Sequence, residues 1–130
     1  VLVTDGDDNQ STFTFDESLR DLIRDEVAVE VVDTVDIPLA TPLLQKLANT
    51  TGGRFWAGTN PKQLAKSLAK IEQSLRSEYF VAYEPAGELQ PGRFRKIHVK
   101  ARKRLGKLAY RTGYFVPKHE QPPAIGFDDR

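Results

Sequence analysis

Apolar positions along the chain change their spacing several times, and each change predicts a different element. Residues 1–3 form a continuous apolar run that stops at a Thr-Asp-Gly turn, a pattern typical of a short strand buried on both faces of a parallel sheet. A second β-branched run spans residues 27–32, and residues 15–23 between the two runs carry apolar side chains at helical spacing. The order strand, helix, strand predicts a βαβ unit with parallel strands.

Helix-boundary signals extend this alternation through the next part of the chain. Asp16 is the predicted N-cap of the first helix, and Thr41, followed by proline, is the predicted N-cap of the second. Gly52 and the glycine after it end the second helix, and residues 54–57 form a third strand. Asn60, again followed by proline, starts a long third helix.

The pattern changes after the third helix. Residues 79–83 are aromatic and β-branched, residues 94–102 alternate with a period of two, and residues 108–116 form a last apolar run. Glycine and proline turns separate these runs, which predicts a three-stranded antiparallel extension. The predicted organisation is therefore a parallel α/β part at 1–76, an antiparallel β extension at 77–117 and a tail or linker at 118–130.

Composition narrows the possible functions. The 130 residues suit one domain, and the absence of cysteine excludes disulfides, thiol catalysis and cysteine-based zinc sites. No apolar run approaches the roughly 20 residues of a membrane-spanning helix. Residues 93–111 contain nine basic side chains and no acidic one, although the net charge is only +1. We favour a solvated face for this basic span over a nucleic-acid partner, because its aromatic residues are expected to face the core.

Taken in order, these segments resemble the second half of a von Willebrand factor A (VWA) domain, of the bacterial VWFA-related type abundant in Acidobacteria. Residues 1–6 are similar to its fourth strand and Thr-Asp-Gly turn, and 27–32 to its fifth strand. Residues 44–55 are similar to a helix, its Gly-Gly stop and the last core strand, 64–75 to the final helix, and 77–115 to the bacterial continuation. The resemblance implies a partial Rossmann-like fold in which helices flank parallel strands.

The resemblance also implies a metal-ion-dependent adhesion site. In the family, an Asp-x-Ser-x-Ser loop, a threonine and the aspartate of Thr-Asp-Gly hold Mg²⁺, Mn²⁺ or Ca²⁺, and a partner protein's acidic side chain completes the ion's ligands. Asp5 matches that last aspartate, while Thr4, Asp7 and Asp8 are expected to surround it without contacting the ion. The implied protein is a non-enzymatic binding module, secreted or periplasmic in a bacterium.

The remaining ligands of that site are not in this sequence. We therefore expect this chain to be a fragment that begins inside the domain. The other ligands would lie upstream of residue 1, and the fragment would bind metal weakly. The strand at residues 1–4 is expected at an exposed edge of the sheet, where it invites self-association. Asp33 and Asp36 follow the second strand near the same end of the sheet, and we favour solvated loop positions for both.

A Mg²⁺-dependent phosphatase of the haloacid dehalogenase type is the alternative. In that interpretation Asp5 attacks phosphorus and Asp7 acts as acid and base. The chemistry also needs a lysine and further polar groups after later strands. Lys46 and Lys62 instead fall in or at the start of predicted helices, so the binding module is favoured.

Overall fold

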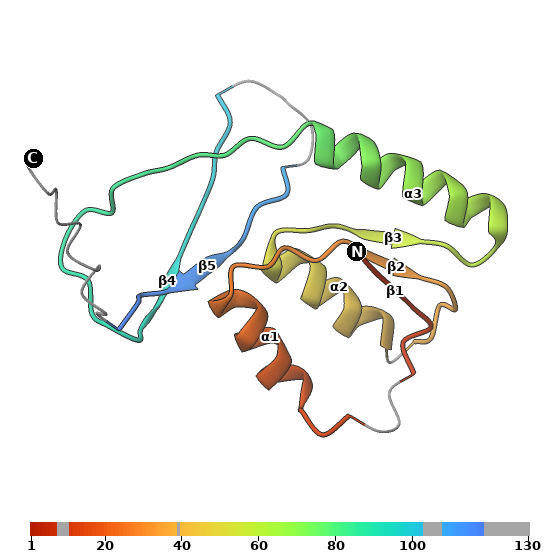
Figure 1. The fold of residues 1–130 in the computed structure, drawn as a ribbon, viewed down its shortest axis with the longest axis horizontal. Coiled ribbons are helices and arrows are strands. Elements are labelled where there is room, and N and C mark those ends of the chain that lie inside the picture. The colour runs from red at the N-terminus through yellow and green to blue at the C-terminus, as the bar shows by residue number, and fades with distance from the viewer. Residues whose placement is uncertain (8–10, 39, 103–107, 119–130) are drawn as a thin grey trace, which may run out of the picture.

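The computed structural model describes residues 1–7, 11–38, 40–102 and 108–118. It is a mixed α/β structure in which a three-stranded parallel sheet with flanking helices precedes a separate two-stranded antiparallel sheet (Figure 1). The elements are β1 (Leu2–Thr4), α1 (Phe15–Arg24), β2 (Val31–Asp33), α2 (Ala40–Thr51), β3 (Phe55–Ala57), α3 (Pro61–Arg76), β4 (Phe94–Lys96) and β5 (Gly113–Phe115).

The parallel sheet has the order β1-β2-β3, so the predicted parallel βαβ unit is confirmed. Val3 pairs with Val32, which pairs with Trp56 on the other side. The middle strand β2 is the most deeply buried, because Val31 and Val32 have no exposed surface. Its continuous apolar sequence matches a strand covered on both faces.

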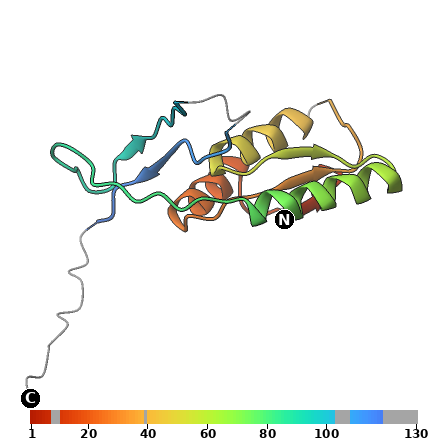
Figure 2. The ribbon, with the colours of Figure 1, turned by 90° about the horizontal axis from the view of Figure 1, so that it is seen from above.

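Helices α2 and α3 lie on opposite sides of this sheet (Figure 2). The main core lies under α1 and α2 and is formed by Leu19, Val29, Val31, Leu47 and Ala48. On the other side, α3 covers β3 with Ser67 and the buried Ile71, and it leaves the face of β1 uncovered.

Two predicted helix caps are wrong, because Asp16 and Thr41 both lie inside their helices. Thr14, not Asp16, caps α1: its hydroxyl accepts from the Glu17 backbone N–H at 3.3 Å, and the Glu17 carboxylate accepts from the Thr14 N–H at 2.8 Å. This reciprocal arrangement pairs two backbone N–H groups that would otherwise lack acceptors, which explains why Thr14 and not Asp16 is the cap. Thr41 lies inside α2, which begins at Ala40. The predicted start of α3 at Asn60, which the structure shows as its N-cap, and the predicted glycine end of α2 are confirmed.

The second strand is shorter than its β-branched run. The stretch before β2 is fastened to the end of α2 instead, because the Val29 N–H donates to the Thr51 hydroxyl at 3.1 Å. Gly53 packs so closely that an added Cβ would overlap the Val29 carbonyl oxygen. Pairing with both neighbouring strands therefore begins at Val31, although the Glu30 carbonyl already accepts from the Leu2 N–H at 2.8 Å.

The predicted three-stranded antiparallel extension is wrong, because the described structure has only the pair β4 and β5 there. These two strands pair Arg95 with Tyr114, and the rings of Phe94 and Phe115 meet edge to face at 5.2 Å. Residues 79–83 form no strand, and the side chains of Tyr79 and Phe80 are 92% and 95% exposed. Because these side chains are not buried, they gain no packing energy that could offset the entropy lost when the chain is ordered as a strand. Of the predicted tail, only Lys118 lies within the described residues.

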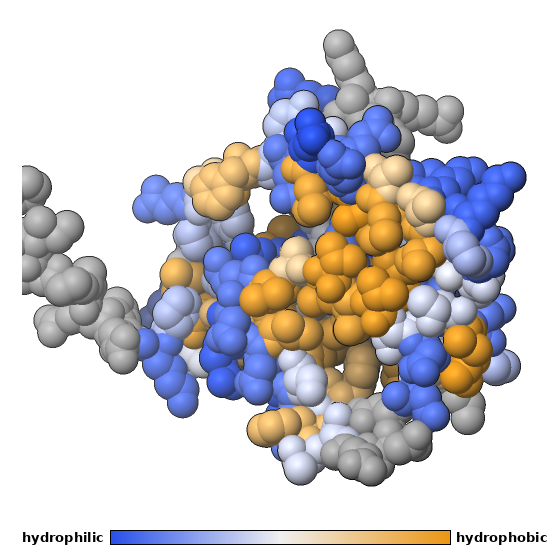
Figure 3. All heavy atoms as spheres, turned by 45° about the vertical axis from the view of Figure 1, so that its right-hand side comes forward, coloured by the Kyte–Doolittle hydropathy of each residue, from blue (hydrophilic) through white to orange (hydrophobic). Residues whose placement is uncertain are grey.

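Strand β1 lies at the edge of the sheet, as predicted for residues 1–4, and among the described strands it pairs with β2 alone. The predicted burial of its side chains on both faces is wrong, since Val1, Leu2 and Val3 are all exposed. Figure 3 shows apolar side chains gathered on one face of the molecule. Exposed apolar residues of β1 and of α3 include Leu2, Val3, Leu68 and Leu75.

The cap of α1 generates a pH prediction. Hydrogen bonds from the Thr14 backbone N–H and then its hydroxyl lower the pKa of Glu17 below the ordinary glutamate value. A lowered pKa in the folded state stabilises the fold at neutral pH, and this contribution is lost as pH falls through the folded-state pKa. We expect Glu17→Gln, which keeps the cap's shape, to be less stable than wild type at pH 7.

The difference between wild type and Glu17→Gln should shrink in acid and vanish once Glu17 is protonated in both states. Urea unfolding at a series of pH values measures it, with Glu88→Gln, an exposed position outside the helices, as the control. A difference that does not change with pH would contradict the role of the Glu17 charge.

Candidate functional site

The carboxyl end of β1 carries the aspartate singled out by the sequence. Asp5 follows the strand directly, and Gly6 turns the chain with φ of 79°. The Gly6 N–H donates to the Thr4 hydroxyl at 3.0 Å, and the Asp7 N–H donates to the Asp5 carboxylate at 3.2 Å. Asp5 and Asp7 are both exposed. The turn therefore presents carboxylate oxygens to solvent at the end of the sheet where α/β proteins bind ligands.

The aspartate that ends β2 has a different environment. Asp33 is only 3% exposed. One of its carboxylate oxygens accepts from the Thr41 hydroxyl at 2.8 Å and the other from the Val35 N–H at 3.1 Å. The predicted solvated loop position is therefore wrong for Asp33, while Asp36 is exposed in the loop as expected. Both oxygens of Asp33 hold the start of α2 and the loop after β2 in place.

The two strand ends are connected to each other. The Thr34 backbone N–H and its hydroxyl both donate to the Thr4 carbonyl, at 2.9 and 3.0 Å. Gly6 lies against the first residue of α2, where an added Cβ would come within 2.7 Å of the Ala40 Cβ. The turn that carries Asp5 is thus fixed by contacts with the β2 loop and with α2.

These residues supply part of a metal-binding ligand set. Among the residues that the structure describes, no group of three or more histidine, aspartate and glutamate side chains could hold a metal ion. Asp5 is an exposed carboxylate of the kind that Mg²⁺ or Ca²⁺ prefers, whereas both oxygens of Asp33 are already hydrogen-bonded. Asp8, predicted to lie near Asp5, is outside the described residues.

A second feature lies at the opposite edge of the sheet. A cleft of about 740 Å³ runs along β3, between the strand and a later segment of chain. We call it the β3 cleft; it is lined by Gln45, Asn49, Gly53, Arg54, Phe55, Trp56, Leu108, Ala109, Tyr110 and Thr112. No sequence pattern predicts this cleft, because its two walls are separated by more than fifty positions and neither carries a motif.

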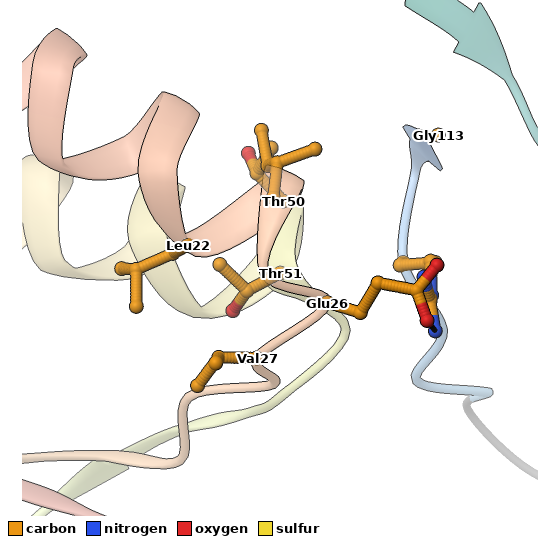
Figure 4. A pocket seen from close by; sticks show the side chains of 8 residues that line it. Leu22, Glu26, Val27, Thr50, Thr51 and Gly113 are labelled. Carbon is orange, nitrogen blue, oxygen red and sulfur yellow. Dashed lines mark hydrogen bonds and ion pairs between the residues drawn. The ribbon is translucent and has the colours of Figure 1, made fainter. Parts of the chain in front are cut away.

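The wall formed by residues 108–112 is fastened to the body at a small junction (Figure 4). Arg111 pairs with the Glu26 carboxylate at 2.9 Å, and the Thr112 N–H donates to the Thr50 carbonyl at 3.2 Å. Glu26 lies two residues after the end of α1 and has φ of 59°. Its side chain points toward the segment that contains Arg111. The junction encloses only about 10 Å³, room for no more than a water molecule, and is a packing contact.

The described basic side chains of residues 93–111 have different surroundings. Arg111 is used in the Glu26 ion pair, and a guanidinium N–H of Arg95 donates to the Ala86 carbonyl at 2.6 Å. Lys96 and Lys100 are exposed. The solvated-face interpretation of this span stays a prediction.

Comparison with known proteins gives no relative for this chain: no family model, no curated protein and no solved structure matches it. Within the described part of the chain, every helix is too short or too polar to traverse a bilayer.

The buried contact between Thr41 and Asp33 generates a stability prediction. Thr41→Val removes the hydroxyl and leaves one buried carboxylate oxygen of Asp33 without its donor. We expect a loss of about 1–3 kcal/mol in the free energy of unfolding, the usual cost of an unsatisfied buried polar group. Urea denaturation measures it.

Thr59→Val is the matched control, since the exposed Thr59 hydroxyl donates to the Gln63 side chain on the surface. Its effect should stay within about 0.5 kcal/mol. Equal losses for the two variants would show that Asp33 does not depend on Thr41.

Proposed function

We propose that the protein is a metal-ion-dependent protein-binding module of the von Willebrand A type, in which Asp5 is one ligand of a divalent ion. The observation that carries the proposal is the position of Asp5, exposed on a turn at the carboxyl end of a parallel strand and anchored by Thr4 and Gly6. The order of strands and helices after it is the order that the resemblance implies.

The ion would be Mg²⁺, Mn²⁺ or Ca²⁺, because exposed carboxylates are hard oxygen ligands. We propose that its other ligands lie outside this sequence and that the partner protein contributes an acidic side chain. The module would act outside the cytoplasm of a bacterium. Asp7, whose backbone N–H donates to the Asp5 carboxylate, would orient that ligand.

The proposal predicts weak but localised metal binding by this chain. We expect Mn²⁺ to bind with a dissociation constant on the order of 1 mM, because one carboxylate displaces little of the ion's water. The paramagnetic ion should broaden the NMR amide signals of residues 4–7 first. Asp5→Asn should abolish this effect, and Asp25→Asn, at an exposed carboxylate beyond α1, should not.

Broadening that is the same in wild type and in Asp5→Asn would contradict a ligand role for Asp5. The same variant tests the phosphatase alternative. Turnover of p-nitrophenyl phosphate with Mg²⁺ that is lost in Asp5→Asn would favour the enzyme and overturn the binding module.

We further propose that the chain self-associates through β1. A strand with an open edge and exposed apolar side chains can pair with a second chain. Val3→Lys puts a charge on that edge and should abolish association in sedimentation experiments. Val35→Lys is the matched control, since Val35 is 51% exposed and Val3 50% exposed. A wild-type chain that sediments as a monomer at all concentrations would contradict the proposal.

A further inference from the structure

We propose that the β3 cleft binds an extended, acidic peptide segment of another protein, which adds to the edge of β3 as a fourth strand. Recognition of this kind joins backbone hydrogen bonds along a sheet edge to pockets for alternate side chains. Three properties of the described residues support it: an open strand edge, a fixed opposite wall and a lining with a basic side chain and no acidic one.

The open edge is the outer side of β3. Within the described part of the chain, β3 pairs only with β2. Val31 pairs with Phe55 in register, and its N–H donates to the Arg54 carbonyl at 2.9 Å. In a parallel ladder alternate residues bond to the same neighbour, so the N–H and C=O of Phe55 are directed away from β2, toward the cleft.

The open part of this edge is short and well defined. At the far end of β3, the outward carbonyl of Ala57 accepts from the Ser67 hydroxyl of α3 at 2.7 Å. That contact closes the edge beyond Ala57. The segment before it, around Phe55, remains available for backbone pairing.

The opposite wall of the β3 cleft is held to the body, so the cleft is a built feature of the fold. Thr112 is fastened to Thr50 through its backbone N–H and its hydroxyl, at 3.2 and 3.3 Å. Arg111 pairs with Glu26, and Gly52 lies so close to Arg111 that an added Cβ would be 2.6 Å from its backbone nitrogen. The volume of about 740 Å³ lies within the range of ligand sites in proteins.

The lining selects the charge of the peptide. Among the described residues that line the cleft, Arg54 is the one basic side chain and none is acidic. One guanidinium N–H of Arg54 donates to the Ser74 hydroxyl of α3 at 2.6 Å. Lys70 of α3, outside the lining, lies 5.9 Å from the centre of the Trp56 ring. The carboxylate of Glu30 is buried and accepts from the Trp56 indole N–H, so it is not available at the surface. A glutamate or aspartate side chain of the peptide would therefore meet one basic side chain, Arg54, and no acidic one among the described residues of the lining. Phe55 and Tyr110 provide apolar contact for its neighbours.

This site is separate from the metal site proposed above. Asp5 follows β1 at one edge of the sheet, and the β3 cleft lies along the other edge. Peptide binding there needs no divalent ion, so measurements in EDTA distinguish it from the adhesion-type function.

Fluorescence anisotropy with defined probes tests the proposal. The main probe is a labelled, capped seven-residue peptide of alternating valine and glutamate, and we expect it to bind in EDTA more tightly than about 1 mM. A second probe has threonine in place of glutamate, and a third has the amide nitrogens along one edge methylated. The methylated probe should lose at least about tenfold in affinity, because it cannot donate the backbone hydrogen bonds.

Two variants locate the site. Ala109→Trp fills the cleft from its exposed wall and should weaken the glutamate probe by at least about tenfold, whereas Ala86→Trp, outside the cleft, should not. Arg54→Gln should weaken the glutamate probe several-fold and leave the threonine probe unchanged. Circular dichroism spectra of the three variants check that each is folded.

No binding of the glutamate probe by the wild-type chain at about 1 mM would overturn the proposal. Equal binding of the methylated probe, or equal binding by Ala109→Trp and wild type, would overturn it as well. If Ala109→Trp instead changes the sedimentation of the chain while no probe binds, the occupant is a second copy of the chain and not a foreign peptide.

Discussion

The pairing of β2 with a strand on each side is the interaction on which the rest of the structure depends. Val31 and Val32 have no exposed surface, and they align Leu2 and Val3 with Phe55 and Trp56. Because the three strands are parallel, their carboxyl ends meet along one side of the sheet. The loop after β2 then fastens the turn that carries Asp5, through two hydrogen bonds from Thr34 to the Thr4 carbonyl.

The parallel part could be predicted because its signals are local and redundant. Apolar runs and helical spacing agree with proline and glycine at the helix boundaries, so the element order follows from sequence. The errors arise where two local signals compete. Thr14 and Asp16 are both good capping residues, and only the reciprocal contact with Glu17 decides between them. Thr41 likewise does not cap its helix, and its hydroxyl instead donates to the buried Asp33 carboxylate.

The antiparallel part was predicted less well because strand formation there depends on distant partners. Residues 79–83 have the composition of a strand, yet Phe80 is 95% exposed and no described strand pairs with them. The pairing of β4 with β5 brings Phe94 against Phe115, and Gly113 lets the strands approach, since an added Cβ there would overlap the Arg95 carbonyl oxygen. The β3 cleft arises in the same way, from the long-range contact of Thr112 with Thr50, and has no local signal.

A three-stranded parallel sheet has two edge strands, and the surroundings of the two edge strands differ here. Beside β1, Leu2 and Val3 are exposed, and no described strand pairs with the outer side of β1. Beside β3, one wall is fixed by an ion pair and hydrogen bonds, and one outward carbonyl is already closed by Ser67. An unwalled apolar edge favours association with any complementary strand, whereas a walled edge limits length, charge and direction. Of the two sheet edges, the one beside β3 is therefore where selection between partner strands is to be sought, whereas the metal-dependent binding proposed for Asp5 lies at the carboxyl end of β1 and uses neither edge.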